Sequence, residues 1–218
     1  MPQIVDPLEG AELRRAIVGR DVRLVFTWLD DRWGHTLQFG TADPMILLAS
    51  QEDTPADLPA DAPTRPVYQQ LHFQQADNGC LALLVGQAGH DHFSASIHFT
   101  EHDGGATSID FDIAGRHTRR DMPASGLTTA YVVALSPSDV EEASHRVVRW
   151  ASHNPRGHLM VGPVAAVDNP TIVLLGESGR RHSVLQVYSP PDPVAAALRC
   201  RYRWTWESPR PDPARPTS

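Results

Sequence analysis

Residues 67–114 read VYQQLHFQQADNGCLALLVGQAGHDHFSASIHFTEHDGGATSIDFDIA. Apolar and polar side chains alternate through much of this stretch, which is the pattern of antiparallel strands that bury one face. Two segments, Asp77-Asn78-Gly79 and Asp103-Gly104-Gly105, have the residue types of tight hairpin turns. We therefore predict a meander of five strands, which cover residues 67–75, 80–87, 92–101, 106–114 and 127–135.

The turn positions also predict the register of these strands, because directly opposed residues of an antiparallel pair share a face. With turns centred at residues 77, 90 and 104, the odd-numbered residues form one buried apolar face. The predicted pairs on that face are Phe73 with Leu81, Leu71 with Leu83, Val85 with Ala95, Leu83 with Ile97, Leu81 with Phe99, and Phe99 with Ile109. The same register places His98 opposite Asp110 and Ser96 opposite Asp112 on the even-numbered, polar face.

The rest of the chain adds strands and two helices. We expect helices at residues 7–18, with Asp6 as N-cap, and at 137–151, with Ser136 or Ser138 as N-cap. Further strands are expected at residues 22–28, 35–39, 45–49, 158–167, 171–176, 182–188 and 197–206. The predicted fold class is α+β, predominantly antiparallel β, as a meander sheet or partly closed barrel with one or two packed helices.

The 218 residues are expected to form one globular domain over residues 1–207. Residues 53–66 contain four prolines, which cannot continue a helix or a central strand, so we expect a surface loop there. Residues 208–218 are also rich in proline and are expected to be a disordered tail.

Composition excludes several function classes. All 19 Lys+Arg residues are arginine, so chemistry that needs a lysine amine, such as pyridoxal phosphate attachment or a Walker-type phosphate loop, is excluded. The net charge of −7 argues against nucleic-acid binding. No apolar run could span a bilayer, and the N-terminal residues do not resemble a signal peptide. We therefore expect a cytoplasmic location, and in that reducing compartment the two cysteines, Cys80 and Cys200, are expected to stay free thiols.

Polar residues on the expected strands form a candidate ligand-binding surface. Three arginines alternate along residues 197–206 and lie about 6.6 Å apart on one strand face, which suits carboxylate or phosphate recognition. The candidate ligand-binding residues are His72, His98, Asp110, Asp112, Arg199, Arg201 and Arg203. A second basic cluster, Arg116, His117, Arg119 and Arg120, falls in a long connection. The alternative is a solvated outer sheet face on which the arginines pair with acidic neighbours or protect an edge strand.

A divalent metal site is the second hypothesis, with His90, His92 and His98 as candidate ligands. The His90-Asp91-His92 triplet resembles the His-x-His of cupins, but the glutamate that should follow closely is missing, since Glu101 is nine residues beyond His92. His92 and His98 would also lie about 20 Å apart on one strand.

Three functions are therefore open. We expect a non-enzymatic module that binds a small polar or anionic ligand, or a protein partner, through the polar sheet face. The alternatives are a metal-dependent enzyme with cupin-like chemistry, and a structural or assembly protein that pairs through an exposed strand edge.

Overall fold

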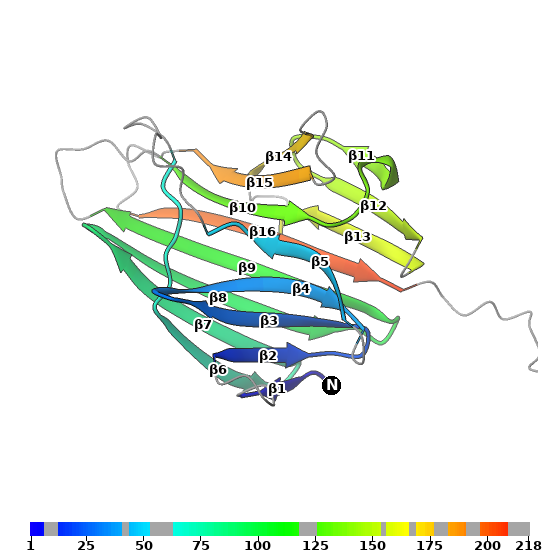
Figure 1. Cartoon of the computed structure of the whole chain (residues 1–218), viewed down its shortest axis with the longest axis horizontal. Coiled ribbons are helices and arrows are strands. Elements are labelled where there is room, and N and C mark those ends of the chain that lie inside the picture. The colour runs from blue at the N-terminus through cyan, green and yellow to red at the C-terminus, as the bar shows by residue number, and fades with distance from the viewer. Residues whose placement is uncertain are drawn as a thin grey trace, which may run out of the picture.

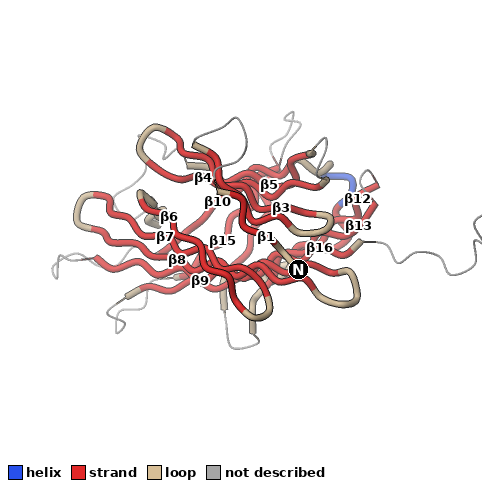
Figure 2. Tube along the Cα trace, turned by 90° about the horizontal axis from the view of Figure 1, so that it is seen from below, coloured by secondary structure: helices blue, strands red, loops and turns tan. Residues whose placement is uncertain are grey.

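The computed structural model describes residues 1–6, 13–40, 44–52, 63–117, 126–153, 156–165, 169–176, 183–190 and 197–208. These residues form two antiparallel eight-stranded sheets, stacked as a sandwich (Figures 1 and 2). The first sheet has the order β1 (Gln3–Val5), β2 (Arg14–Val18), β3 (Val22–Leu29), β4 (Arg32–Phe39), β5 (Met45–Ser50), β10 (Leu127–Val133), β15 (Ser183–Ser189), β14 (Thr171–Gly176). The second has the order β11 (Val140–Ala143), β12 (Val148–His153), β13 (Arg156–Gly162), β16 (Leu198–Glu207), β9 (Ala106–His117), β8 (Asp91–Glu101), β7 (Gly79–Ala88), β6 (Gln70–Ala76).

The predicted α+β class is wrong. The described ranges contain no α-helix, and their one helical segment is the 3-10 helix η1 (Pro137–Asp139). Each sheet ends in two edge strands, so the molecule is a sandwich and not the predicted partly closed barrel. In the part of the chain that the structure describes, no helix is long and apolar enough to cross a membrane.

The stretch predicted as a helix at residues 137–151 forms η1, β11 and most of β12. Ser136 does cap a helical turn, but that turn ends after three residues. In β12 the fully buried residues Val148 and Trp150 are two positions apart, which is the period of a strand. Trp150 pairs with Leu159 of β13, so pairing within the sheet overrides the helical spacing of the apolar residues.

The predicted helix at residues 7–18 is wrong over its described part, because Arg14–Val18 form β2. This strand pairs with β1 on one side and β3 on the other, and tertiary pairing of this kind outweighs local helix signals. Residues 7–12 of the prediction lie outside the described residues.

Most of the predicted strands are confirmed. The hairpin of β3 and β4 turns at Asp30 and Asp31, and Asp30 has the positive φ of 56° that such a turn requires. The hairpin of β14 and β15 and the strands β5 and β16 also lie where they were expected. The loop predicted at residues 53–66 lies mostly outside the described residues, and so does the tail from residue 209.

The predicted meander contains four strands and not five. Strands β6 to β9 are consecutive neighbours in the second sheet, whereas β10 crosses to the first sheet and lies between β5 and β15. On the far side of β9 the neighbour is β16, the last strand of the described chain. This insertion places the arginines of β16 beside the aspartates of β9.

The register is confirmed for one hairpin and wrong for two. Phe99 lies opposite Ile109, as predicted. In the other two hairpins Leu84, and not Leu83 or Val85, is opposite both Leu71 and Ala95. The turns β6–β7 and β7–β8 each contain two residues, so their centres fall between residues and every side chain of β7 changes face. Leu83 and Val85 are consequently exposed and do not belong to the core.

The space between the sheets is filled largely by aromatic side chains. The ring of Trp204 in β16 lies 4.4 Å from that of Phe111 in β9 and 4.8 Å from that of Tyr131 in β10, measured between centroids. Tyr202 stacks on Phe111 at 4.7 Å. Because alternate residues of β16 are anchored in this core, Arg199, Arg201 and Arg203 point to the outer side of the second sheet.

Contacts at both edges connect the sheets. The Arg15 guanidinium of β2 donates a hydrogen bond of 3.2 Å to the Leu71 carbonyl of the edge strand β6. At the other edge the Ile172 amide of β14 donates to the His145 carbonyl, in the turn between β11 and β12.

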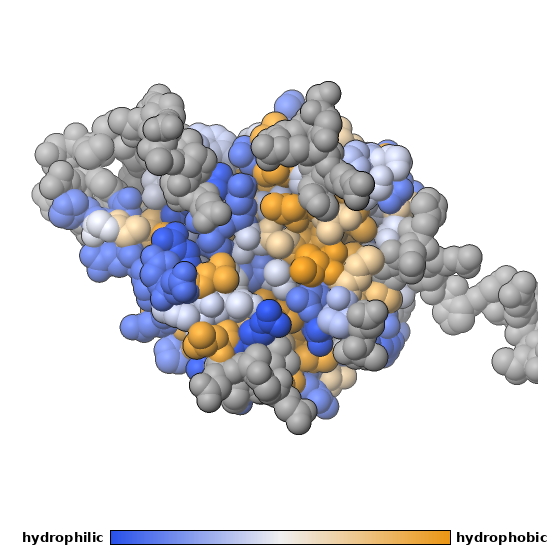
Figure 3. Space-filling model, in the orientation of Figure 1, coloured by the Kyte–Doolittle hydropathy of each residue, from blue (hydrophilic) through white to orange (hydrophobic). Residues whose placement is uncertain are grey.

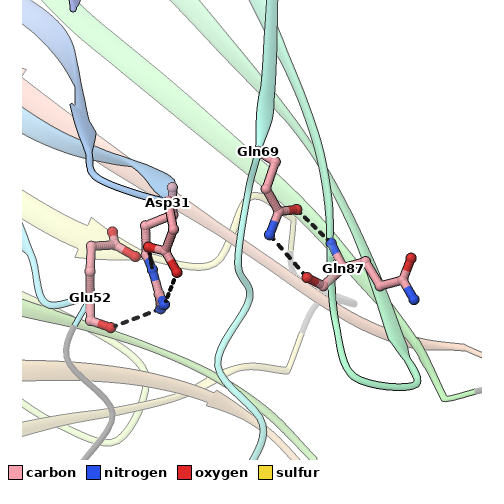
Figure 4. Close-up of polar contacts among 5 residues, drawn as sticks. Asp31, Glu52, Gln69 and Gln87 are labelled. Atoms are coloured by element: carbon pink, nitrogen blue, oxygen red, sulfur yellow. Dashed lines mark hydrogen bonds and ion pairs between the residues drawn. The ribbon is translucent and has the colours of Figure 1, made fainter.

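The segment that leads into β6 is also fixed to its surroundings. The Gln69 side chain forms two hydrogen bonds with the Gln87 backbone (Figure 4). At the nearby turn between β3 and β4, Arg32 donates hydrogen bonds to its neighbour Asp31 and to the Glu52 carbonyl (Figure 4). A Cβ atom at Gly86 would collide with the carbonyl of Val67, so this close crossing requires glycine.

Candidate functional site

Strands β8, β9 and β16 carry most of the predicted ligand-binding residues on their outer side. We call this surface the ladder face. Its members are His92, Ser94, Ser96, His98, Thr100, Ala106, Ser108, Asp110, Asp112, Ala114, Arg116, Arg199, Arg201, Arg203, Thr205 and Glu207. They face away from the core because Phe93, Ala95, Ile97 and Phe99 of β8 and the aromatic residues of β16 face inward.

The predicted pairing of His98 with Asp110 and of Ser96 with Asp112 is confirmed. On the other side of β9, Asp110 lies opposite Arg203 and Asp112 lies opposite Arg201. Each aspartate therefore stands between a residue of β8 and an arginine of β16.

The aspartates form ion pairs with the arginines. Arg199 donates to both carboxylate oxygens of Asp112, with Nε 2.6 Å from Oδ1, and Arg201 Nε lies 3.7 Å from Oδ2 of the same residue. Arg203 donates to both oxygens of Asp110, with Nη2 2.7 Å from Oδ2. This hydrogen bonding raises the pKa of Arg203. The arrangement matches the alternative stated above, in which the arginines pair with acidic neighbours.

His98 lies opposite Asp110, whose carboxylate oxygens both accept hydrogen bonds from Arg203. Its Nε2 atom is buried and has no hydrogen-bond partner among the described residues. A Cβ atom at Gly79 of β7 would lie 3.3 Å from this nitrogen, so the imidazole rests over the backbone of the neighbouring hairpin.

His72 lies apart from the ladder face. It is exposed on β6 and pairs with Leu83 of β7, which separates it from Ser96 and Asp112. The outer surface is therefore less uniformly polar than predicted, because the outward residues of β7 include Leu81, Leu83 and Val85.

The three predicted metal ligands are not brought together. His90 lies in the turn between β7 and β8, and His92 and His98 remain six residues apart on one strand. Among the described residues, no three His, Cys, Asp or Glu side chains are positioned to hold a metal ion.

Arg116 belongs to the second basic cluster of the sequence and lies on the ladder face opposite His92. The side chains of His117, Arg119 and Arg120 fall outside the described residues. One end of the ladder face therefore combines Arg116 with Arg199.

A buried polar cluster in the core escaped the sequence analysis. His35 Nε2 lies 3.3 Å from the Tyr131 hydroxyl, which is itself hydrogen bonded to the Tyr202 hydroxyl. Burial lowers the pKa of His35 to about 4. The available signal was the alternation of Trp33, His35 and Leu37, which puts a histidine at a core position of the strand.

Comparison with known proteins adds little. No family model matches the chain, and no curated protein matches it. Among solved structures, the 4-alpha-glucanotransferase from Thermococcus litoralis is similar over 95% of this chain, with 7% sequence identity and a TM-score of 0.42. The chain spans 39% of the length of that enzyme.

Proposed function

We propose that this chain is a non-enzymatic binding module that contacts an anionic partner through the ladder face. The observation that supports this proposal most directly is the local excess of positive charge. Four arginines (Arg116, Arg199, Arg201 and Arg203) share the face with Asp110, Asp112 and Glu207, which gives an excess of one positive charge on a chain whose net charge is −7.

The ion pairs hold the guanidinium groups in place, and each carboxylate also competes with an incoming anion for the arginine donors. Asp112 and Asp110 each engage an arginine with both carboxylate oxygens, which orients the planar forks before any ligand arrives. Asp112 lies within ion-pair distance of both Arg199 and Arg201, so one negative charge is shared between two positive ones. Carboxylate and phosphate groups are the natural partners of such a surface.

The proposed partner is either a small anion or an acidic segment of a protein, since both present the same oxygen anions. We infer a cytoplasmic location, which agrees with two cysteines that are buried thiols without a disulfide. The metal-dependent enzyme gains no support from the positions of His90, His92 and His98, and we do not propose it.

Two probes test the proposal. A fluorescein-labelled hexaglutamate peptide is titrated by fluorescence anisotropy, and tripolyphosphate is titrated by calorimetry, both at low ionic strength because exposed charges are screened by salt. We expect at least one probe to bind, and Arg199→Ser and Arg201→Ser each to weaken binding about fivefold. Tighter binding of the peptide would indicate an acidic protein segment as the partner, and tighter binding of tripolyphosphate would indicate a small anion.

The matched control is Arg14→Ser, which removes an exposed arginine from β2 in the other sheet. We expect it to leave the affinity of both probes unchanged. If neither probe binds, or if Arg14→Ser weakens binding as much as Arg201→Ser, the ladder face is not an anion-binding surface.

A further inference from the structure

A second distinctive surface lies on the outer side of the first sheet. The neighbouring strands β5, β10, β15 and β14 contain no Asp, Glu, Arg or His in their sequences, whereas β2, β3 and β4 of the same sheet all contain arginine. Half of this sheet is therefore uncharged on both of its faces. Its inner face belongs to the core, and its outer face points away from the second sheet.

The outer face carries a row of apolar side chains that crosses the four strands. Ala49, Val132, Val184 and Leu175 lie directly opposite one another, one from each strand. Leu175 is 43% exposed, and so is Ile46 at the start of β5. Figure 3 shows hydrophobic residues gathered over β5, β10 and β15 on this side of the molecule. We call the outer side of these four strands the uncharged face.

We propose that two copies of this chain associate weakly through the uncharged face, with one sheet packed against the other about a two-fold axis. Two-fold contacts of this type join the same patch on both copies, so the patch has to be complementary to itself. An apolar, uncharged patch meets that condition, and sheets packed face to face lie about 10 Å apart.

Charge supports a second copy as the occupant. Two copies with a net charge of −7 each repel one another, and a contact through charged surfaces would add local like-charge pairs. The uncharged face brings apolar groups together without opposing charges. The four strands themselves carry no cation for an acidic partner and no acidic group for a basic one, so a chemically similar surface suits them best.

The size of the face indicates a weak contact. Four strands at about 4.8 Å spacing and six to seven residues in length cover about 20 by 20 Å, or about 400 Å² on each copy. Two copies would bury about 800 Å², which is below the area of standard stable complexes and within the range of transient ones. We expect a dimer that forms at high protein concentration and dissociates on dilution.

Sedimentation velocity over a concentration series, from about 10 μM to about 1 mM, measures this association. We expect the mean mass to rise toward that of a dimer. Val184→Arg should weaken the dimer at least about tenfold, because it brings two positive charges together at the two-fold contact. The matched control is Leu83→Arg, which puts a charge on an exposed leucine of the second sheet and should leave the dimer intact.

Charge pairing separates a lost contact from a misfolded variant. Val184→Glu alone should be monomeric like Val184→Arg, and a mixture of the two variants should form a heterodimer, because opposite charges then meet. A wild type that stays monomeric up to about 1 mM overturns the proposal. So does a mixture that fails to associate, or a dimer that is lost with Leu83→Arg and kept with Val184→Arg. The test does not involve the ladder face, so it stands apart from the anion-binding experiment.

Discussion

The Nε2 atom of His35 lies 3.3 Å from the hydroxyl oxygen of Tyr131, and both side chains are buried between the two sheets. The imidazole is surrounded by the rings of Phe26, Phe111 and Trp204. A charged imidazolium at this position would lose its hydration without gaining a carboxylate partner. This explains why burial lowers the pKa of His35 to about 4, against an ordinary value of 6.5.

We predict that acid destabilises the fold through His35. The pKa is depressed in the folded state, so the unfolded chain takes up the proton first as the pH falls. The stabilisation is complete above the unfolded pKa of about 6.5 and is lost progressively down to about pH 4, by a total of about 3 kcal/mol. Urea denaturation between pH 7 and pH 4 measures this slope.

His35→Phe should flatten the slope in that window, since the variant lacks the buried imidazole that the folded state keeps neutral. The control His72→Gln removes an exposed histidine from β6 and should leave the slope as in the wild type. Equal slopes for the wild type and His35→Phe would show that other groups cause the acid sensitivity.

We predict that Asp112→Asn strengthens anion binding about fivefold, because it removes the carboxylate that competes for Arg199 and Arg201. The measurement is titration with the hexaglutamate peptide. Asp31→Asn is the control, since it also removes a carboxylate that is paired with an arginine, but in the β3–β4 turn of the other sheet. Weaker binding to Asp112→Asn would mean that the orienting effect of the aspartate outweighs its charge.

Gly86→Ala should destabilise the protein by about 2 kcal/mol or more, because the backbone or its neighbours must shift to accept the methyl group. The added Cβ would meet the Val67 carbonyl and would lie 2.8 Å from the Tyr68 Cα atom. At Gly104, by contrast, no atom lies within 4 Å of the added Cβ. Thermal unfolding of both variants checks this, and we expect Gly104→Ala to stay within about 0.5 kcal/mol of the wild type.

Arg15→Met should loosen the contact between the sheets at β6. The substitution removes the hydrogen bond to Leu71, the ion pair with Asp6 at 3.0 Å, and the cation–π contact with Trp33 at 5.3 Å. We expect a loss of about 1–2 kcal/mol in urea denaturation and faster hydrogen exchange of the β6 amides. Arg14→Met, at the exposed neighbouring position, should change neither. Unchanged exchange in Arg15→Met would show that the edge is held by other contacts.

How well a strand could be predicted from the sequence depends on whether only one of its faces is apolar. In β16 the buried residues Cys200, Tyr202 and Trp204 alternate strictly with arginines, so the strand and its faces could be predicted. Residues 80–85 are apolar on both faces, so alternation does not determine their register. A turn centre displaced by half a residue therefore still predicts an apolar buried face for β7. The helix predicted at residues 137–151 failed because its apolar spacing fits both periods, and only the pairing of Trp150 with β13 decides between them.

The candidate site was predictable where two strands are joined by one clear turn. His98 and Asp110 face one another as expected, because Glu101 and Thr107 enclose a turn whose centre falls on a residue. The partners of the arginines were not predictable, because β16 lies 80 residues or more beyond β9 in the chain and nothing local indicates where it inserts. The buried position of His35 depends likewise on the sheet opposite.

The position of β16 has a consequence for synthesis on the ribosome. Residues 198–207 emerge after every other described strand, yet they fill the gap between β13 and β9 in the middle of the second sheet. Until they emerge, both neighbouring strands present unpaired edges, and the inner aromatic side chains of β9 lack Tyr202 and Trp204. A nascent chain of this protein is therefore exposed to aggregation until strand β16 has emerged and inserted between β13 and β9.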